Sequence, residues 1–233
     1  MRVISRKIDK LNRDFGKSSP LEILNSSINL LYKDAIVYVC SFGSESAIIL
    51  HMISKIDKNF PIILINTKFL FDETMDYKKE LTDKLQLKNC TEIFPDLSDI
   101  RSNDKNNNLW KSDTNKCCHL RKVLPLQKEL AEYKAWISGR KAYHEGERKK
   151  LKVFEFLNDK MVVNPLANMT QNDVSKYFND YKLPRHPLFS KGFLSIGCRQ
   201  CTVVASSNND VRSGRWINST KTECGIHLRN EKV

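Results

Sequence analysis

Short apolar runs alternate with segments of helical periodicity along most of the chain. The runs with the length of buried strands are residues 35–40, 61–66, 90–94, 135–138 and 161–163. Between them, apolar residues recur three or four positions apart, which predicts helices over residues 44–56, 72–87, 120–133 and 170–181. Thr170 and Asp173 resemble a capping box, with Asp in place of the usual Glu or Gln, at the start of the last helix.

This alternation predicts an α/β fold in which a parallel sheet is covered by helices on both faces. Such sheets bind ligands at the carboxyl ends of their strands, where the strand order reverses. We expect residues 1–182 to form the α/β domain and the polar stretch 102–108 to be a loop within it. Residues 183–233 show no clear periodicity and are predicted to be a loop-rich, mobile C-terminal segment of the same domain.

Composition narrows the class of protein. The 233 residues are 40% hydrophobic, which is enough for a packed core. Every apolar run is strand-sized, so no membrane span is expected, and the basic N-terminus lacks the apolar region of a secretory signal. A cytoplasmic location is therefore the expectation. The net charge of +12 favours an anionic partner, which by charge alone is a nucleotide, a nucleic acid or an acidic protein.

The seven cysteines are distributed unevenly. A structural disulfide framework is improbable in a reducing compartment, and Cys40 and Cys90 lie in apolar runs as expected for buried residues. The others are an adjacent pair, a C-x-x-C motif and a lone cysteine, namely Cys117, Cys118, Cys198, Cys201 and Cys224. Four thiolates suit zinc or an iron–sulfur cluster, and buried free thiols are the plainer alternative. Adjacent ligands fit a zinc knuckle poorly because consecutive side chains diverge.

Two loops directly after predicted strands are candidate anion sites. The first opens the helix at 44–56 with small residues that let a phosphate approach the backbone, namely Ser41, Gly43 and Ser44. It lacks the Lys of a phosphate-binding Walker loop, and a plain serine-capped turn is an equal alternative. The second holds Asn66 and Thr67, which on their own also suit an ordinary polar loop.

Basic residues and the lone cysteine supply further candidates. The basic run 139–152 follows the fourth strand and is either a solvated face or a site where Arg140, Lys141 and Arg148 meet a phosphate or sulfate. Arg212 and Arg215 are a second candidate pair. Gly225 and His227 lie close to Cys224, and cationic neighbours favour the nucleophilic thiolate. An incidental cysteine near the end of the chain is the alternative.

Taken together, seven segments resemble one enzyme family: SFGSES, INTKFLFDET, CCHLRKVLPL, GRKAYHEGER, SIGCRQC, GRW and ECGIHL. They resemble the assimilatory sulfonucleotide reductases, specifically the bacterial adenylyl-sulfate (APS) reductases that carry a 4Fe–4S cluster. The resemblance spans roughly residues 35–228. It implies a Rossmann-like parallel sheet of the nucleotide α-hydrolase type and the reduction of APS to sulfite and AMP in sulfate assimilation and cysteine biosynthesis.

The resemblance also implies roles for single residues. The cluster ligands would be Cys117, Cys118, Cys198 and Cys201. The nucleophile would be Cys224, with His227 beside it and Lys122 between cluster and substrate. The substrate-binding residues would be Ser41, Gly43, Ser44, Asn66, Thr67, Arg121, Arg148, Arg212 and Arg215. Asn66 and Lys68 replace an Asp and a Gly of the family pattern, and many members have a second arginine and a glutamine in the basic segment.

The implied reaction has two steps. The Cys224 thiolate attacks the sulfate sulfur, AMP leaves, and an S-sulfocysteine remains. A dithiol then releases sulfite by exchange at the Cys224 sulfur. Because no thioredoxin-like domain follows Val233 in this sequence, we expect a separate thioredoxin or glutaredoxin as reductant. No nucleic acid or membrane partner is expected, and a homo-oligomer is possible.

Three alternatives remain at this stage. A 3′-phosphoadenylyl sulfate (PAPS) reductase would share most motifs, although that branch generally lacks the four cluster cysteines. An ATP pyrophosphatase that modifies tRNA shares the fold, but its S-G-G-x-D-S loop does not match SFGSES and leaves ECGIHL unexplained. A zinc-containing nucleic-acid-binding module fits the charge but lacks a stripe of basic and aromatic residues.

Overall fold

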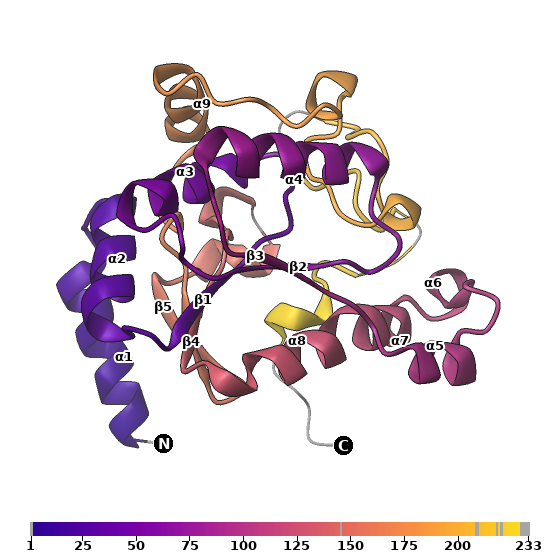
Figure 1. Ribbon diagram of the computed structural model, residues 1–233, viewed down its shortest axis with the longest axis horizontal. Coiled ribbons are helices and arrows are strands. Elements are labelled where there is room, and N and C mark those ends of the chain that lie inside the picture. Colours follow the sequence, from indigo (N-terminus) through magenta and orange to yellow (C-terminus); the bar gives the residue numbers. More distant parts are fainter. Residues whose placement is uncertain (1, 145, 208–209, 218, 220, 229–233) are drawn as a thin grey trace.

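A six-stranded sheet forms the centre of the computed structural model, which describes residues 2–144, 146–207, 210–217, 219 and 221–228 (Figure 1). Its strand order is β3-β2-β1-β4-β6-β5. The strands are β1 (Ile36–Val39), β2 (Ile62–Ile65), β3 (Cys90–Ile93), β4 (Ala135–Ile137), β5 (Phe154–Leu157) and β6 (Lys160–Val163). All pairings are parallel except that of β5 with β6. The predicted α/β fold with a parallel sheet is confirmed.

Strand β5 was missed because its signal is weak. It is an edge strand of four residues in which only Phe154 is fully buried, so its apolar pattern is incomplete. It joins β6 through Asn158 and Asp159, whose φ angles of 48° and 62° are those of a tight hairpin turn. The other five strands lie where the apolar runs predict them.

Helices cover both faces of the sheet (Figure 1). The α-helices are α1 (Arg2–Phe15), α2 (Pro20–Ser26), α3 (Ala47–Ile56), α4 (Asp72–Leu85), α5 (Leu97–Asn103), α6 (Leu109–Ser112), α7 (Thr114–Cys118), α8 (Leu124–Glu129) and α9 (Gln171–Asp180). Two π-helical segments cover Ser27–Leu31 and His119–Val123. The 3₁₀ turns are Leu130–Glu132, Ala142–His144, Gly146–Lys150, Phe189–Lys191, Arg199–Cys201 and Gly225–His227. Among the described residues, we find no helix with the length and apolar character that a membrane crossing requires.

The central strands β1, β2 and β4 are apolar throughout because both faces of the sheet are buried there. Ile36 and Tyr38 of β1 belong to the core under α2, α3, α4 and α9, whereas Val37 points to the opposite face. There Val37 joins Trp136 and Leu126, which comes from α8. Figure 1 shows α3 and α4 on one side of the sheet and α8 on the other.

Helices α3, α4 and α9 confirm three of the four predicted helices, and the capping box of Thr170 and Asp173 is present. Helices α1 and α2 were not predicted. The stretch 102–108 is not entirely loop, because α5 continues to Asn103. Cys40 is buried as expected, but Cys90 is only partly buried.

The predicted helix over residues 120–133 is wrong at its start and in its continuity. Helical structure begins at Thr114, where Asp113 accepts a hydrogen bond from the Lys116 amide at 2.8 Å. It then passes through a π-helical segment, in which the Leu124 amide bonds to the His119 carbonyl five residues back. Pro125 follows at once and has no amide hydrogen, so it cannot donate an α-helical hydrogen bond. The regular α-helical pattern is therefore interrupted at this point.

We expect Asn12 to stabilise the edge strand β5. The side-chain amide of Asn12 donates to the Phe154 carbonyl at 2.8 Å, and its side-chain oxygen accepts from the Phe154 amide at 3.0 Å. A side chain of α1 therefore binds two backbone groups at the free edge of the sheet. Asn12→Ala should lower the free energy of unfolding by about 1–3 kcal/mol in urea titrations, since two backbone groups lose their partner. The exposed Asn29→Ala is the control and should change it little. Equal stability of the two variants would contradict this role.

Candidate functional site

The main pocket lies at the carboxyl ends of β1 and β4. The chain runs outward from β1 to β2 and β3 on one side and from β4 to β6 on the other, so the strand order reverses between β1 and β4. Crevices at such a reversal are where open α/β sheets bind ligands. The cavity measures about 190 Å³ and is lined by residues of the loop after β1, of the segment after β4 and of the C-terminal part of the chain, together with Thr67 and Lys122. Segments far apart in the sequence therefore meet at the position that the fold predicts.

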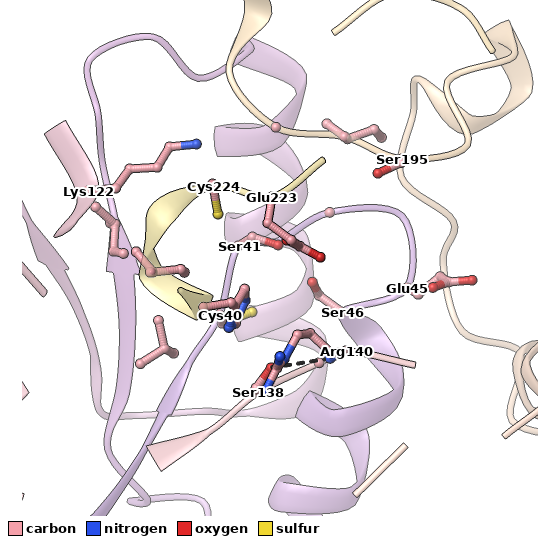
Figure 2. Close-up of a pocket in the computed structure, with 18 of the residues that line it drawn as sticks. Cys40, Ser41, Glu45, Ser46, Lys122, Ser138, Arg140, Ser195, Glu223 and Cys224 are labelled. Atoms are coloured by element: carbon pink, nitrogen blue, oxygen red, sulfur yellow. Dashed lines mark hydrogen bonds between the residues drawn. The ribbon is translucent and has the colours of Figure 1, made fainter. Parts of the chain in front are cut away.

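The loop after β1 forms one wall of the pocket. Ser41, Gly43 and Ser44 all line it, as expected from the sequence. Phe42 takes a left-handed φ of 48° and is fully buried, which anchors the loop. The Ser44 hydroxyl donates to the Leu194 carbonyl at 2.7 Å, so that side chain holds the C-terminal segment. Ser41 is exposed, and Figure 2 shows it on the loop opposite Glu223.

A half-buried carboxylate, Glu45, organises the basic wall after β4. Glu45 accepts hydrogen bonds from Lys141 at 2.7 Å, from His144 Nε2 at 3.1 Å and from the Tyr143 hydroxyl. Burial acts to raise the pKa of Glu45, but the Lys141 charge and these bonds outweigh it, and the pKa lies well below its ordinary value. Glu45 is therefore ionised and fixes three side chains that follow β4.

His144 connects Glu45 to Arg148. Arg148 Nη1 lies 3.1 Å from His144 Nδ1, and a guanidinium can only donate, so Nδ1 accepts. The proton of the neutral ring is then on Nε2, which donates to Glu45. Burial lowers the pKa of His144 to about 4, which keeps the ring neutral at pH 7. The tautomer of His144 is thus determined by its two partners.

Arg148 in turn binds the C-terminal segment. Its Nε and Nη2 atoms donate to the two oxygens of Glu223, with 2.9 Å for Nη2. Arg212 Nη2 lies 3.6 Å from the same carboxylate and donates to the Thr222 carbonyl at 2.6 Å. Both oxygens of Glu223 are occupied, and its residue surface is only 5% exposed. The ion pair between Arg148 and Glu223, which are 75 residues apart in the sequence, therefore joins two walls of the pocket.

Of the four cysteines expected to bind a cluster, Cys198 lines the pocket and the other three do not. Cys117 and Cys118 end α7, while Cys198 and Cys201 flank a 3₁₀ turn. Cys198 lies 3.3 Å from the Thr67 hydroxyl and joins Cys117 in an apolar cluster around Phe69.

Burial affects these thiols differently. It raises the pKa of Cys117 to about 12 and also raises the pKa of Cys118 and Cys201. For Cys198, burial acts in the same direction, but the Lys122 charge and the Thr67 bond outweigh it and lower the pKa. Within the described residues, no three His, Cys, Asp or Glu side chains converge on a single metal ion.

Lys122 and Cys224 both line the pocket and lie near each other (Figure 2). Burial acts to lower the pKa of Lys122, but the thiolate charges of Cys198 and Cys224 outweigh it, so the pKa lies above its ordinary value. Gly225 allows this approach, because a Cβ there would stand 3.0 Å from Val123 on the same π-helical segment. The lysine therefore supplies a fixed positive charge next to the Cys224 sulfur.

His227 cannot supply a second charge there. Its ring stacks on Trp136 with centroids 5.4 Å apart. Burial lowers the pKa of His227 well below its ordinary value, and Arg140, Arg148 and Arg212 lower it further. The ring is neutral at pH 7, so the sequence-based idea that His227 favours the thiolate by charge does not fit this environment. Nδ1 is buried and has no hydrogen-bond partner in the described part of the protein.

Asn66 and Arg121 do not line the pocket. Asn66 donates to Glu92 at 2.7 Å. Arg121 is buried, binds Asp104 at 2.7 Å, and lies 4.0 Å over the Phe69 ring. Both side chains have structural partners, in contrast to the substrate contacts expected of them. Thr67 does line the pocket, but its hydroxyl contacts Cys198.

Sequence reasoning missed the residues that neutralise and stack within the pocket. Glu45, Glu223 and Trp136 line it although none was singled out. The two carboxylates lie inside the motifs SFGSES and ECGIHL, so their positions were visible. The sequence held one signal for these carboxylates, namely that buried cations need counter-charges. That need does not specify which anion pairs with which cation.

Comparisons with known proteins agree on one group of enzymes. The profile of the phosphoadenosine phosphosulfate reductase domain matches residues 35–204. An adenosine 5′-phosphosulfate reductase of Mesorhizobium japonicum is 40% identical over 230 residues, which cover 99% of this chain and 91% of the relative. An enzyme of the same name from Bacillus cereus is 38% identical, with 85% and 86% covered.

Solved structures share the fold. The phosphoadenylyl-sulfate reductase of Candida auris superposes with a TM-score of 0.70 at 27% identity, covering 84% of this chain and 96% of that one. Yeast FAD synthetase superposes with a TM-score of 0.57 at 13% identity, covering 80% and 66%, which shows likeness of fold alone.

The neutral state of His144 predicts a pH effect on stability. Its pKa is lowered from 6.5 to about 4 in the folded protein, so between these values the unfolded chain binds a proton that the folded one does not. Stability is present above pH 6.5 and is lost as pH falls toward 4, by up to about 1.4 kcal/mol per pH unit. Urea titrations of wild type at pH 6.5 and 4.5 should show this loss.

His144→Gln should remove that part of the pH dependence. A Gln amide can accept from Arg148 and donate to Glu45, as the neutral ring does, but it does not titrate. The exposed His119→Gln is the matched control and should follow the wild type. Parallel stability curves for wild type and His144→Gln would show that the ring is not held neutral.

Proposed function

The chain belongs to the phosphoadenosine phosphosulfate reductase family, and we propose that it reduces adenylyl sulfate to sulfite and AMP in sulfate assimilation. The observation that carries this proposal is the position of Cys224, which lies beside Lys122 in an arginine-lined pocket at the strand-order reversal. A thiol nucleophile, fixed cations and a nucleotide-type fold are the parts that transfer of a sulfo group requires. The curated relatives named above support adenylyl sulfate as the substrate.

The first step is transfer of the sulfo group. The Cys224 thiolate attacks the sulfate sulfur, a sulfur–sulfur bond forms, and the bond between that sulfur and the phosphate oxygen breaks. AMP leaves with the electron pair of the broken bond. Lys122 stabilises the attacking thiolate, and Arg212 and Arg215 face the charge that develops on the phosphosulfate.

The second step restores the thiol. A thiolate of an external dithiol attacks the Cys224 sulfur and displaces sulfite, which takes the electron pair of the sulfur–sulfur bond. The second thiol of the reductant resolves the mixed disulfide and returns Cys224 to its reduced form. The dithiol supplies both electrons. Thioredoxin or glutaredoxin remains the expected reductant, and the cytoplasm the expected location.

The proposed substrate contacts come from different groups of residues. Ser41 and the backbone at Gly43 and Ser44 offer hydrogen-bonding groups at the start of the helical segment that leads to α3. Arg148, Arg212 and Arg215 offer cationic donors from the opposite side. Asn66 and Arg121 act on the substrate only through the elements they hold, since neither reaches the pocket. His227 acts as a neutral hydrogen-bonding ring next to Cys224.

The donor set of the four cysteines fits a 4Fe–4S cluster. Four thiols from two segments, three of them buried, provide one ligand for each iron, and the cluster's net charge favours the nearby Lys122 and Arg215. Cys117, Cys118, Cys198 and Cys201 would hold it. When bound, it would supply a fixed charge and a structural tie between α7 and the C-terminal segment.

PAPS is the second candidate substrate. The family profile and the Candida auris structure carry that name. The four cysteines and the curated relatives favour APS. Sulfite release from each nucleotide, with reduced thioredoxin and protein purified without oxygen, decides between them. Release from neither nucleotide would overturn the proposed function.

We expect the cluster to depend on the four cysteines and on no others. Iron and acid-labile sulfide should each approach about four per chain in protein purified without oxygen. Cys198→Ser or Cys201→Ser should lose absorbance near roughly 400 nm and activity together. Cys90→Ser, which alters a partly buried thiol outside the set, should keep both. Stoichiometric zinc without iron would disprove the assignment.

We expect Cys224 to be the nucleophile independently of the cluster. Wild-type protein mixed with APS and no reductant should release about one AMP per chain and then stop, with a mass increase of one SO₃. Reduced thioredoxin should remove the adduct.

Cys224→Ser should retain the iron content and bind APS, but it should give neither burst nor sulfite, since a serine hydroxyl is hardly ionised at neutral pH. Cys90→Ser should behave as wild type. An SO₃ adduct mapped to another cysteine would contradict the mechanism and leave the cluster assignment intact.

A further inference from the structure

Three of the five N–H donors of Arg148 are engaged within the protein, among them the pair formed by Nε and Nη2. Two of its guanidinium nitrogens bind both oxygens of Glu223, and the third binds His144. This two-pronged contact is the one by which arginine binds phosphate or sulfate oxygens. Glu223 therefore lies where an anionic group of a nucleotide would bind to Arg148.

The charges around the pocket support the same conclusion. Six basic side chains line it, namely Lys122, Arg140, Lys141, Arg148, Arg212 and Arg215. Lys141 pairs with Glu45, Arg140 pairs with Glu155, and Arg148 and Arg212 share Glu223. In the described part of the chain, no carboxylate forms an ion pair with Lys122 or Arg215. A phosphosulfate brings two negative charges, so it can replace the single charge of Glu223 and also meet these cations.

The volume of the cavity supports an exchange of anions. Pockets for ligands of this size usually enclose roughly 300–1,000 Å³, and this one measures about 190 Å³. A nucleotide therefore needs part of the lining to withdraw. Glu223 is a lining side chain on the C-terminal segment, and Figure 2 shows it reaching from that segment toward the loop that carries Ser41 and Ser46.

We propose that Glu223 is a specificity-determining residue: it occupies the anion subsite on Arg148 and Arg212 until the substrate's phosphosulfate displaces it. Its carboxylate keeps two buried guanidinium groups paired, since an uncompensated buried charge is strongly destabilising. It also competes with every anion that enters. A simple anion has only one group to offer in exchange, whereas the nucleotide adds the contacts of its phosphate, sulfate and adenosine.

This inference rests on the proposed function but is tested by binding alone. The probes are AMP and inorganic sulfate, titrated calorimetrically into the full chain with its cluster. Glu223→Gln keeps the size of the side chain and removes its charge, so both probes should bind about tenfold tighter than to wild type, equivalent to about 1.4 kcal/mol. Glu92→Gln, which breaks the ion pair with Lys78 outside the pocket, is the control and should leave both affinities unchanged. Unchanged or weaker binding to Glu223→Gln would overturn the proposal, because a carboxylate that only orients Arg148 aids anion binding.

A second variant tests whether the subsite is one that a carboxylate fills. In Glu223→Ala, added acetate should take the vacated position and weaken AMP binding, whereas the same acetate should leave AMP binding to wild type unchanged. Acetate without effect on Glu223→Ala contradicts the proposal.

Wild-type protein gives a measurement that needs no variant. Saturating AMP should speed hydrogen exchange at the amides of residues 222–224, because the side chain that anchors them is released; slower exchange there contradicts the proposal. Failure of the proposed function would appear separately, as absence of sulfite from APS with wild-type enzyme.

Discussion

The buried positive charge of one crevice is the constraint on which the rest of the site depends. Six cationic side chains converge where the strand order reverses between β1 and β4, and each buried one requires a nearby anion. Glu45, Glu155 and Glu223 supply that negative charge for four of the six cations. Most of the charged side chains that line the pocket are consequently paired with one another or with Glu155.

That network joins three parts of the chain that are far apart in sequence. Glu45 comes from the loop after β1, His144 and Arg148 from the segment after β4, and Glu223 from the C-terminal segment. Each contact is a hydrogen bond to a charged group, which is stronger than a neutral one. Glu223, the residue before Cys224, thus ties the proposed nucleophile to Arg148.

The residues around Cys224 suit the transfer of a sulfo group, which is the reaction proposed for this family member. Lys122 lines the pocket together with Cys224, while the neutral His227 packs on Trp136 and leaves the Cys224 sulfur approachable from the pocket. The same lysine faces Cys198, one of the four cysteines proposed to hold the cluster, so one side chain connects the reacting sulfur with the cysteine site. The π-helical segment brings this about, because it carries Lys122 toward the pocket and Arg121 toward Asp104.

The sequence by itself determined the layered fold and the family to which the chain belongs. Apolar runs of strand length, separated by helical periodicity, were sufficient for the parallel sheet because burial on both faces leaves a local signature. The cysteine spacing and the motif around Cys224 were likewise visible in the chain. Only the tertiary structure decided which cation meets which anion: Arg148 meets Glu223, Arg121 meets Asp104, and Lys141 meets Glu45. Periodicity is a property of neighbouring residues, whereas an ion pair between residues 75 positions apart depends on how whole segments pack, and no local pattern records that.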